Sequence, residues 1–431
     1  MAVVGLLVLL ALAWHRTLPA TSAVPVAFDA AVVERGADLA ALGNCASCHT
    51  ARDGPPYAGG VPLATGFGTL YGTNITPERE TGIGTWSEAA FVRAMREGVS
   101  RDGSQLYPAF PYGHFRRMAD DDLRALYAFV MTRDPVHAAN VANDLRFPFG
   151  FRPLVAGWNL LFLRRTASQQ DPARSVEWNR GAYLADALGH CSGCHAPRNA
   201  LGAEKTGRGL AGGEAEGWTV PALDARSPSP LPWTVEQLTE YLRTGITHDH
   251  AMAAGPMQEV VTSLARAPAD DVHAIAVYVQ SQMGAATPAR QARAEAAVRR
   301  ASLGPLARVQ AEAGAGAPSR VDPELLRLGE SVYQGACAGC HDLGRTVSSN
   351  GALRLPLAVA VYDPDPRSLL RIVRQGIAPG PAQPGRWMPA FGTMLTDGQL
   401  VALLAYLRSS AADAPPWPDL ARHVRETKAA P

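Results

Sequence analysis

Cysteine is scarce in this 431-residue chain, which has only six, all confined to three short motifs. Net charge is also nearly absent, because 40 basic residues face 39 acidic ones, so no long-range field indicates a nucleic-acid partner. Long runs of β-branched residues are missing, whereas Ala, Gly and Pro are abundant. This composition favours short helices joined by ordered loops, and the length leaves room for about three domains.

A long hydrophobic run is missing as well. The apolar N-terminal stretch covers residues 1–14 and stops at His15 and Arg16. As a helix it would extend about 21 Å, whereas the hydrocarbon core of a bilayer measures about 30 Å. Its length is typical of a signal peptide, although the usual positively charged n-region is lacking. Two alternatives stay open: a signal peptide cleaved after Thr21-Ser22-Ala23, or an uncleaved anchor that begins upstream of Met1.

The six cysteines form three pentapeptides of the type Cys-x-x-Cys-His, with none left over. This pattern is typical of c-type haem attachment, in which two thiols add to the porphyrin vinyl groups and the adjacent His ligates the iron. The sequence therefore predicts three covalently bound haem c groups. Their attachment residues would be Cys45 and Cys48, Cys191 and Cys194, and Cys337 and Cys340, with the proximal ligands His49, His195 and His341.

Two other kinds of site use the same cysteine spacing. A structural zinc site would pair two such motifs, and three motifs cannot pair without a remainder. A thioredoxin-like redox pair would need a βαβ context, and no Val/Ile-rich strand precedes any of the motifs. Covalent haem is therefore favoured. Because this attachment occurs outside the bacterial cytoplasm, we expect the chain on the periplasmic side of the cytoplasmic membrane, held there by an N-terminal anchor.

The segments around each motif repeat in one order. An opening helix with a Gly on one face precedes the motif, a second helix ends in Arg-x-Gly, and a closing helix begins with acidic residues. Each Arg could bind a haem propionate or be a solvated cation at a helix end. The aromatic residues Phe129, Tyr278 and Tyr406 of the closing helices should pack on the Gly faces. We expect opening helices over 34–43, 179–189 and 327–333, second helices over 91–98, 238–245 and 369–376, and closing helices over 120–131, 270–280 and 397–407.

A haem that only transfers electrons normally has a sixth ligand, often Met. In the third repeat the best candidate is Met388, in a loop rich in Pro and Gly, whereas Met394 is expected in the core. In the second repeat Met257 occupies the matching place, and Met252 and His250 are weaker candidates. These residues predict Met ligation for the second and third haems.

The first repeat departs from this pattern, because Phe110 stands where Met is expected. Since Phe cannot ligate iron, either the ligand is displaced or the site is open. His114 and Met118 are the candidate ligands. His114 is preferred because it stays in the loop, whereas Met118 borders the closing helix. If His114 ligates the iron, this haem should have the lowest potential of the three.

Between the first two repeats, residues 154–163 form an apolar run that is too short to span a bilayer. We expect a helix packed against another domain or a partner, with contact to a membrane surface as the alternative. Residues 285–323 form a linker rich in Ala and Arg that should be partly helical. The Pro-rich tail should end in a short helix.

Several phrases of the chain resemble the three-haem cytochrome c subunits of bacterial membrane-bound dehydrogenases. This family serves alcohol, gluconate, sorbitol and fructose dehydrogenases, and a close branch serves molybdenum hydroxylases such as nicotinate and isoquinoline oxidoreductases. Phe110, His114 and residues 151–163 look more like the molybdenum branch, because the alcohol branch typically has Met in place of Phe110. The matching phrases are Thr73–Pro77, Thr81–Trp86, Tyr107–Tyr112, Ala196–Asn199, Ala254–Met257 and Met388–Gly392.

The resemblance implies an all-α fold of three tandem class I cytochrome c domains, with linkers and an N-terminal hydrophobic segment. The implied role is an electron-transfer subunit without substrate chemistry. It would take electrons from a dehydrogenase catalytic subunit, a molybdenum hydroxylase being favoured, and pass them to ubiquinone or a terminal oxidase at the membrane. The expected boundaries are 1–28 for the signal or anchor, 29–135, 176–284 and 321–411 for the three domains, 136–175 and 285–320 for the linkers, and 412–431 for the tail.

Two other functions compete with the electron-transfer hypothesis. A haem enzyme such as a cytochrome c peroxidase would use an open iron in the first domain, and the missing Met at Phe110 is its only support. A haem-based gas sensor would need a signalling domain, and none is evident in the sequence. Carbon monoxide should bind little to a protein in which every iron has six ligands, so this measurement separates the hypotheses.

Overall fold

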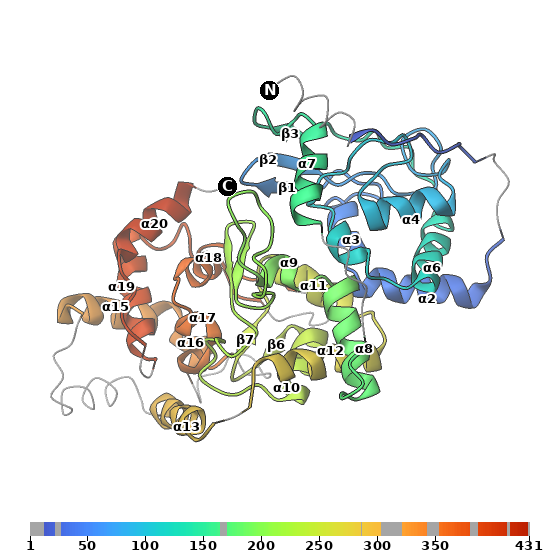
Figure 1. Cartoon of the computed structure of the whole chain (residues 1–431). Helices are drawn as coiled ribbons and strands as arrows, with labels where there is room; N and C mark the ends of the chain where they lie inside the picture. The colour runs from blue at the N-terminus through green and yellow to red at the C-terminus, as the bar shows by residue number, and fades with distance from the viewer. Residues whose placement is uncertain are drawn as a thin grey trace. The chain divides into compact units, whose positions relative to one another are not determined.

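The structure is a computed structural model that describes residues 13–21, 27–163, 170–285, 287–302, 321–342, 353–379, 387–411 and 414–429 (Figure 1). Most of the predicted N-terminal hydrophobic segment, residues 1–12, lies outside the described residues. The chain divides into two compact parts. The first contains Met1–Gly193, Arg198–Lys205 and Arg266–Tyr278, and the second contains Cys194–Pro197, Thr206–Ala265 and Val279–Pro431.

The first part holds the whole first repeat and the opening helix of the second. The opening helix of the second repeat ends in η1, a turn of π-helix. The elements are α2 (Ala30–Leu42), α3 (Cys45–His49), β1 (Pro62–Thr65), β2 (Gly68–Tyr71), α4 (Glu88–Glu97), α5 (Tyr112–Phe115), α6 (Asp120–Met131), β3 (Asp144–Leu145), α7 (Pro153–Phe162), α8 (Val176–Tyr183) and η1 (Leu184–Leu188).

The second part holds the rest of the second repeat and the third repeat. Two helices, α9 and α12, have residues in both parts. The elements are α9 (Ser192–His195), β4 (Gly213–Ala215), β5 (Trp218–Val220), α10 (Val235–Thr244), β6 (Ile246–Thr247), β7 (Ala251–Met252), α11 (Pro256–Leu264), α12 (Ala269–Gln282), α13 (Pro288–Ser302), α15 (Pro323–Ala336), α16 (Ala338–His341), η2 (Leu355–Leu357), α17 (Val359–Tyr362), α18 (Arg367–Gln375), α19 (Asp397–Ser409) and α20 (Leu420–Ala429).

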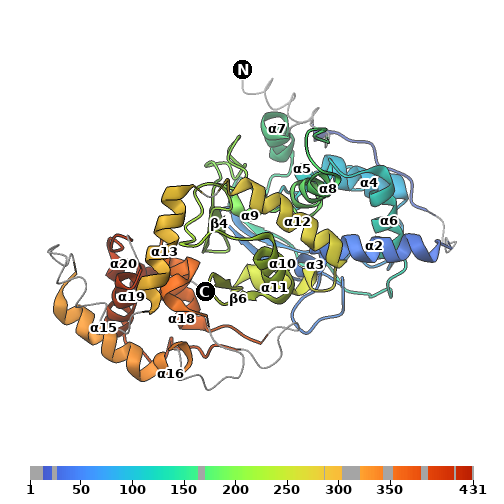
Figure 2. The same ribbon diagram turned by 90° about the horizontal axis from the view of Figure 1, so that it is seen from below.

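The opening and closing helices of each repeat pack directly against each other at a glycine. In the first and third repeats these pairs are α2 with α6 and α15 with α19, which lie side by side (Figures 1 and 2). A Cβ added to Gly36 would lie 2.1 Å from the carbonyl oxygen of Ala125 and 2.6 Å from the Cβ of Phe129. The same close approach joins Gly181 to Ala274 and Tyr278, and Gly329 to Ala402 and Tyr406. The predicted packing of the three aromatic residues is therefore confirmed.

The predicted helices are present, and their caps explain where they begin. In α19 the Thr396 hydroxyl accepts from the backbone N–H of Gln399, whose side chain accepts from the N–H of Thr396, which forms a capping box. Thr234 and Gln237 form the same box at the start of α10. In α6 three acidic residues occupy the first turn, where the helix dipole favours negative charge.

Short antiparallel sheets accompany the helices and were not part of the all-α expectation. Strand β2 pairs with β1 and with β3, while β4 pairs with β5 and β6 with β7. Each strand has only two to four residues. Strands this short do not produce a recognisable alternation of polar and apolar residues, so periodicity could not predict them.

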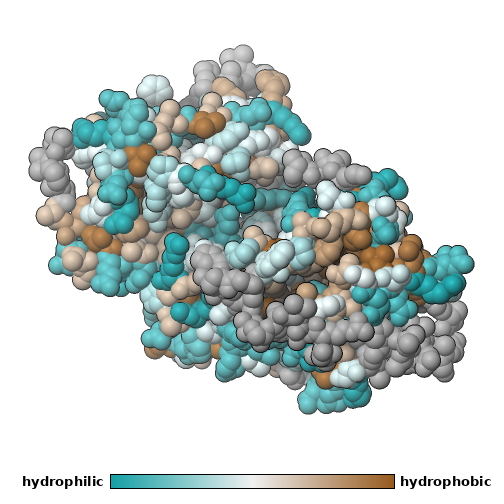
Figure 3. All heavy atoms as spheres, turned by 180° about the vertical axis from the view of Figure 1, so that it is seen from behind, coloured by the Kyte–Doolittle hydropathy of each residue, from teal (hydrophilic) through white to brown (hydrophobic). Residues whose placement is uncertain are grey.

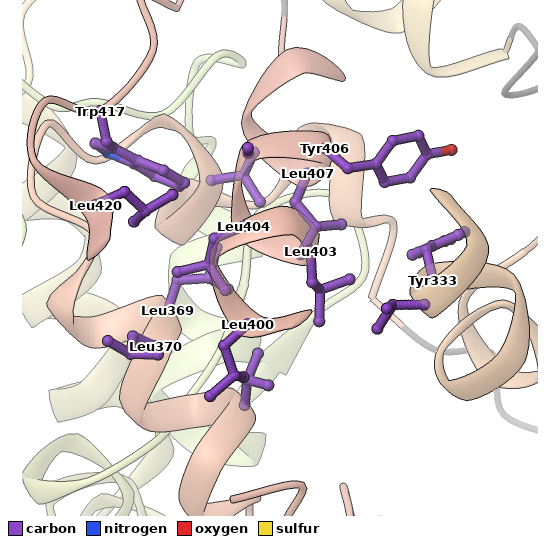
Figure 4. Close-up of a cluster of buried hydrophobic side chains, with 14 of the residues drawn as sticks. Tyr333, Leu369, Leu370, Leu400, Leu403, Leu404, Tyr406, Leu407, Trp417 and Leu420 are labelled. Carbon is purple, nitrogen blue, oxygen red and sulfur yellow. The ribbon is translucent and has the colours of Figure 1, made fainter. Parts of the chain in front are cut away.

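The third repeat has a hydrophobic core built mainly from α18 and α19 (Figure 4). Leu400, Leu403 and Leu404 of α19 are fully buried against Leu369 and Leu370 of α18. The tail after the third repeat closes this core, because Trp417 and Leu420 join it and the Trp417 indole donates to the carbonyl of Asp363 over 2.8 Å. The tail ends in α20, which confirms the expected terminal helix.

The two linkers also contain helices. Residues 154–163 fall almost entirely in α7, as predicted, and α13 lies in the Ala/Arg-rich linker, whose residues 303–320 are outside the described part. Leu160 and Leu161 of α7 are about 70% exposed. The face drawn in Figure 3 is a mixture of hydrophilic residues and small hydrophobic areas. No helix among the described residues has both the length and the apolar character needed to cross a membrane.

Candidate haem-attachment sites

Each Cys-x-x-Cys-His motif lies at a short helical turn, formed by α3, α9 or α16. Cysteines three positions apart on a helix face the same side, so both thiols of a motif can reach one porphyrin edge. All six cysteines keep their thiols rather than forming disulfides. Burial raises the pKa of Cys45 to about 12 and that of Cys337 to about 11. These two residues are therefore protonated thiols at neutral pH.

Each of the three motif histidines makes the same kind of hydrogen bond, from its ring to a backbone carbonyl. The Nδ1 of His49 lies 2.7 Å from the carbonyl oxygen of Thr73, that of His195 lies 2.8 Å from Pro221, and that of His341 lies 3.1 Å from Leu353. A carbonyl can only accept, so each Nδ1 carries the proton and each Nε2 keeps its lone pair for a metal. Burial also lowers the pKa of all three histidines, which favours the neutral ring. This arrangement fits the proximal ligand of a haem iron.

The unpredicted hairpins hold the first two of these histidines. Strand β2 ends at Tyr71, just before Thr73, and β5 ends at Val220, just before Pro221. Where the chain approaches each hairpin, a glycine N–H donates to the histidine carbonyl: Gly59 to His49 over 2.8 Å, and Gly212 to His195 over 2.7 Å. The carbonyl partners were missed by sequence reasoning, although the phrase that begins at Thr73 marked the position of one.

The predicted Met ligands of the second and third repeats lie in different local structures. Met388 pairs its backbone N–H and C=O with those of Ile377, each over 2.9 Å, and its side chain packs with Cys337 against the core of the third repeat. Met257 is partly buried in the first turn of α11. The residue that faces Ile246 in the equivalent turn is Met252 rather than Met257. Both remain thioether candidates by position.

In the first repeat, the residue that corresponds to Met388 in the backbone bridge is Gln105, which pairs with Val99. Gln105 is buried, and its amide oxygen accepts a 3.1 Å hydrogen bond from Asn159. Phe110 lies further along the loop, with its ring centroid 5.5 Å from that of Phe115 and 6.4 Å from that of Tyr112. Aromatic packing thus takes the place of a thioether in this loop.

His114 and Met118 are both buried in the first part. The Nδ1 of His114 lies 2.9 Å from the carbonyl oxygen of Asp186, and its Nε2 lies 2.7 Å from Oε1 of Glu204. Both ring nitrogens are therefore engaged by oxygen atoms of the second repeat. Met118 is 2% exposed, and its carbonyl accepts a 2.8 Å hydrogen bond from Arg96.

Other residues that sequence analysis singled out have structural partners. His250 is fully buried and stacks on Trp233, with ring centroids 3.9 Å apart, while its Nδ1 lies 3.0 Å from the Ser229 hydroxyl. Arg96 and Arg374 form ion pairs with the acidic residue that begins the closing helix, Asp120 and Asp397 respectively. The expectation that Met394 lies in the core is wrong, because 67% of this residue is exposed.

Comparison with known proteins gives the class to which these sites belong. Residues 33–134 match the cytochrome c family, and residues 324–407 match the family of subunit III of cbb3-type cytochrome c oxidase. The chain is 36% identical over 403 residues to the gluconate 2-dehydrogenase cytochrome c subunit of Pantoea cypripedii, which covers 88% of this chain and 86% of that one. It is 34% identical over 403 residues to the fructose dehydrogenase cytochrome subunit of Gluconobacter japonicus, with coverage of 90% and 81%.

The chain belongs to the family of cytochrome c subunits of dehydrogenases. It is also 46% identical over 426 residues to a nicotinate dehydrogenase subunit of Pseudomonas putida, and these residues are 98% of this chain but 34% of that relative. The predicted family and an electron-transfer role without substrate catalysis are thereby confirmed. The peroxidase alternative receives no support from these relatives.

Proposed function

We propose that the chain carries three covalent haems in three tandem class I cytochrome c domains and relays single electrons between a dehydrogenase and a membrane acceptor. The observation that supports three sites is the hydrogen bond from the motif histidine to a backbone carbonyl, which occurs at all three motifs. The repeated glycine contact between opening and closing helices supports the three-domain organisation, with the boundaries expected from the sequence.

When bound, each haem supplies reversible one-electron chemistry, and the protein attaches, ligates and spaces it. The paired thiols fix each porphyrin, and the backbone carbonyls of Thr73, Pro221 and Leu353 orient the ligating imidazoles. Met388 and Met257 are the proposed sixth ligands of the third and second haems. For the first haem, Met118 is the candidate left when His114 is bound to Asp186 and Glu204.

The proposed electron donor is a molybdenum hydroxylase. The relative named as a nicotinate dehydrogenase subunit supports this choice, as do Phe110 and His114 in the first repeat. This chain spans about a third of that relative's length. The proposed acceptor is ubiquinone or a terminal oxidase, reached on the periplasmic side of the cytoplasmic membrane, with the N-terminal segment as anchor.

Haem stoichiometry tests the relay directly. The purified full-length chain should contain three covalent haems, each found on its own Cys-x-x-Cys-His peptide by mass spectrometry, and should accept three electrons in a reductive titration. A Cys337→Ala/Cys340→Ala variant should retain two haems. A chain with fewer than three haems, or one that reduces peroxide at the first iron, would contradict the proposal.

Cofactor analysis of the complex tests the partner. The complex should be purified from solubilised membranes, with this chain as the affinity target. Molybdenum with iron–sulfur clusters in the co-purifying subunits is the expected result. Flavin or a quinone cofactor would keep the relay and reject the molybdenum hydroxylase.

A further inference from the structure

The second repeat differs from the other two in the helix that leads to its cysteines. From the packing glycine to the first cysteine there are nine positions in the first repeat, ten in the second and eight in the third. The longer segment of the second repeat ends in the π-helical turn η1, and the Cys191 N–H donates to the Ala185 carbonyl over 3.0 Å. Single π-helical turns often occur at functional sites. This turn holds Asp186, whose carbonyl faces His114.

Both ring nitrogens of His114 lie within hydrogen-bond distance of oxygen atoms. Its Nδ1 is 2.9 Å from the Asp186 carbonyl oxygen, and its Nε2 is 2.7 Å from a Glu204 carboxylate oxygen. Both ring nitrogens are therefore engaged by oxygen atoms, one from a backbone carbonyl and one from a carboxylate. Burial alone would raise the pKa of Glu204, but hydrogen bonds from His114 and Ser192 outweigh burial and lower it to about 2. With both nitrogens hydrogen-bonded in this way, the ring is held by the second repeat rather than presented to an iron.

Glu204 extends this contact to the second haem motif. Its other carboxylate oxygen accepts from the Ser192 hydroxyl over 2.8 Å, and Ser192 lies between Cys191 and Cys194. A continuous polar chain therefore runs from the distal loop of the first repeat, through His114 and Glu204, to the attachment turn of the second. All of its members belong to the first compact part.

Helix α7 forms hydrogen bonds to both loops that meet at the contact between His114 and Glu204. Asn159 of α7 accepts a 2.7 Å hydrogen bond from the hydroxyl of Tyr112, two residues before His114. The neighbouring Trp158 donates to the carbonyl of Leu201, three residues before Glu204, over 2.9 Å. The linker helix thus contacts the loop of each repeat that supplies one half of the ion pair.

We propose that His114 is a positioning residue that joins the first haem repeat to the second, rather than an iron ligand. The His114 ring, held by Asp186 and Glu204, fixes the distal loop of the first repeat against the attachment turn of the second. We infer that the rate of electron transfer between the first two haems depends on this contact; one iron is oxidised as the other is reduced, with no bond made or broken. The proposal rests on the proposed relay function.

The test compares His114→Gln with a matched control in the full-length, haem-loaded chain. The control is His273→Gln, because Nδ1 of His273 lies 2.8 Å from a Glu177 carboxylate oxygen in an exposed pair between α12 and α8. Three readouts are required: electron paramagnetic resonance of the oxidised protein, amide hydrogen exchange over η1, and the rate at which an electron equilibrates between the first two haems after rapid photoreduction.

His114→Gln should leave the spectra of all three low-spin haems unchanged. It should speed amide exchange at Gly189 and Cys191 by about tenfold or more, because Glu204 loses its buried partner. It should slow equilibration between the first two haems by several-fold, whereas His273→Gln should change none of these readouts. Glu204→Gln, which keeps the size of the side chain, should reproduce the exchange and rate effects.

Two results would overturn the proposal. A high-spin first haem that binds carbon monoxide in His114→Gln would make His114 the iron ligand. Unchanged exchange and unchanged equilibration in both His114→Gln and Glu204→Gln would remove the positioning role. Failure of the relay itself has a different signature, since the unmodified chain would then lack haems or not exchange electrons among them.

Discussion

The distal loops of the first and third repeats show how one scaffold carries different ligand environments. In both repeats the second helix leads to a backbone bridge, Val99 with Gln105 in the first and Ile377 with Met388 in the third. In the third loop the bridging residue is a thioether that packs with Cys337 against the core. In the first loop it is a hydrogen-bonded amide, and the imidazole beyond it binds the second repeat. The scaffold fixes where a loop lies, and its side chains decide whether it packs on its own core or bonds to a neighbouring repeat.

The largest effect should come from breaking the scaffold that both loops share. Gly329→Ala should lower the free energy of unfolding of the third repeat by about 2–3 kcal/mol, because its Cβ would lie 2.1 Å from the Ala402 carbonyl oxygen. Gly36→Ala should act similarly on the first repeat. Denaturant unfolding followed at the haem absorbance measures both changes.

Gly335→Ala is the control for this change, since it lies on the same helix α15 and an added Cβ would meet nothing within 4 Å. It should be neutral or stabilising by about 0.5–1 kcal/mol, because Ala favours helix over Gly. Equal destabilisation by the two variants would mean that the close helix contact does not exist.

The ligand difference between the loops should appear in reduction potentials. Met388→Leu should lower the potential of the third haem by part of the roughly 0.8 V range that axial ligands span, and should open that iron to carbon monoxide. Met394→Leu is the control, because Met394 is 67% exposed. Redox titration of each variant gives the measurement, and an unchanged third potential in Met388→Leu would remove this residue as ligand.

The second repeat sharpens the comparison, because both Met252 and Met257 are partly buried, whereas in the third repeat Met388 is partly buried and Met394 is exposed. Met257→Leu should lower the potential of the second haem, whereas Met252→Leu should shift it little. Redox titration and carbon monoxide binding distinguish the two variants. The reverse result would assign the ligand to the position on β7 that faces Ile246, which is the register of Met388.

The smallest effect concerns two buried histidines. The ring of His114 contacts the Glu204 carboxylate, whereas the ring of His250 contacts the uncharged side chains of Ser229 and Gln237. His250 has no acidic side chain bonded to its ring, and burial lowers its pKa to about 4. Its folded pKa lies below its unfolded value of about 6.5, so the unfolded state takes up a proton first as the pH falls. Stability should therefore decrease from about pH 6.5 towards pH 4, by about 1 kcal/mol at pH 5.5.

His250→Gln should flatten this dependence in unfolding measured from pH 7 to pH 5. The difference between the profiles of the variant and the unmodified chain isolates His250 from other titrating groups. Parallel profiles would show that His250 does not stay neutral in the folded protein.

Sequence periodicity predicted the helices of all three repeats because their apolar and glycine faces recur at helical spacing. The contact of Phe129, Tyr278 and Tyr406 with the glycine faces could be predicted for the same reason, since it follows from one face of each helix. The hairpins could not be predicted, because two to four residues are too few to show a strand period. The exposure of Met394 was missed because one residue in a loop has no period at all.

The sequence by itself determined the haem chemistry, because two thiols and an imidazole within five consecutive residues need no distant contact to come together. Only the tertiary structure decided which distant groups orient the histidines. The carbonyl that orients His49 is 24 residues away, and the carboxylate that binds His114 is 90 residues away. Hydrogen bonds over such separations depend on where folding places each loop, and the spacing of residues along the chain carries no record of that placement.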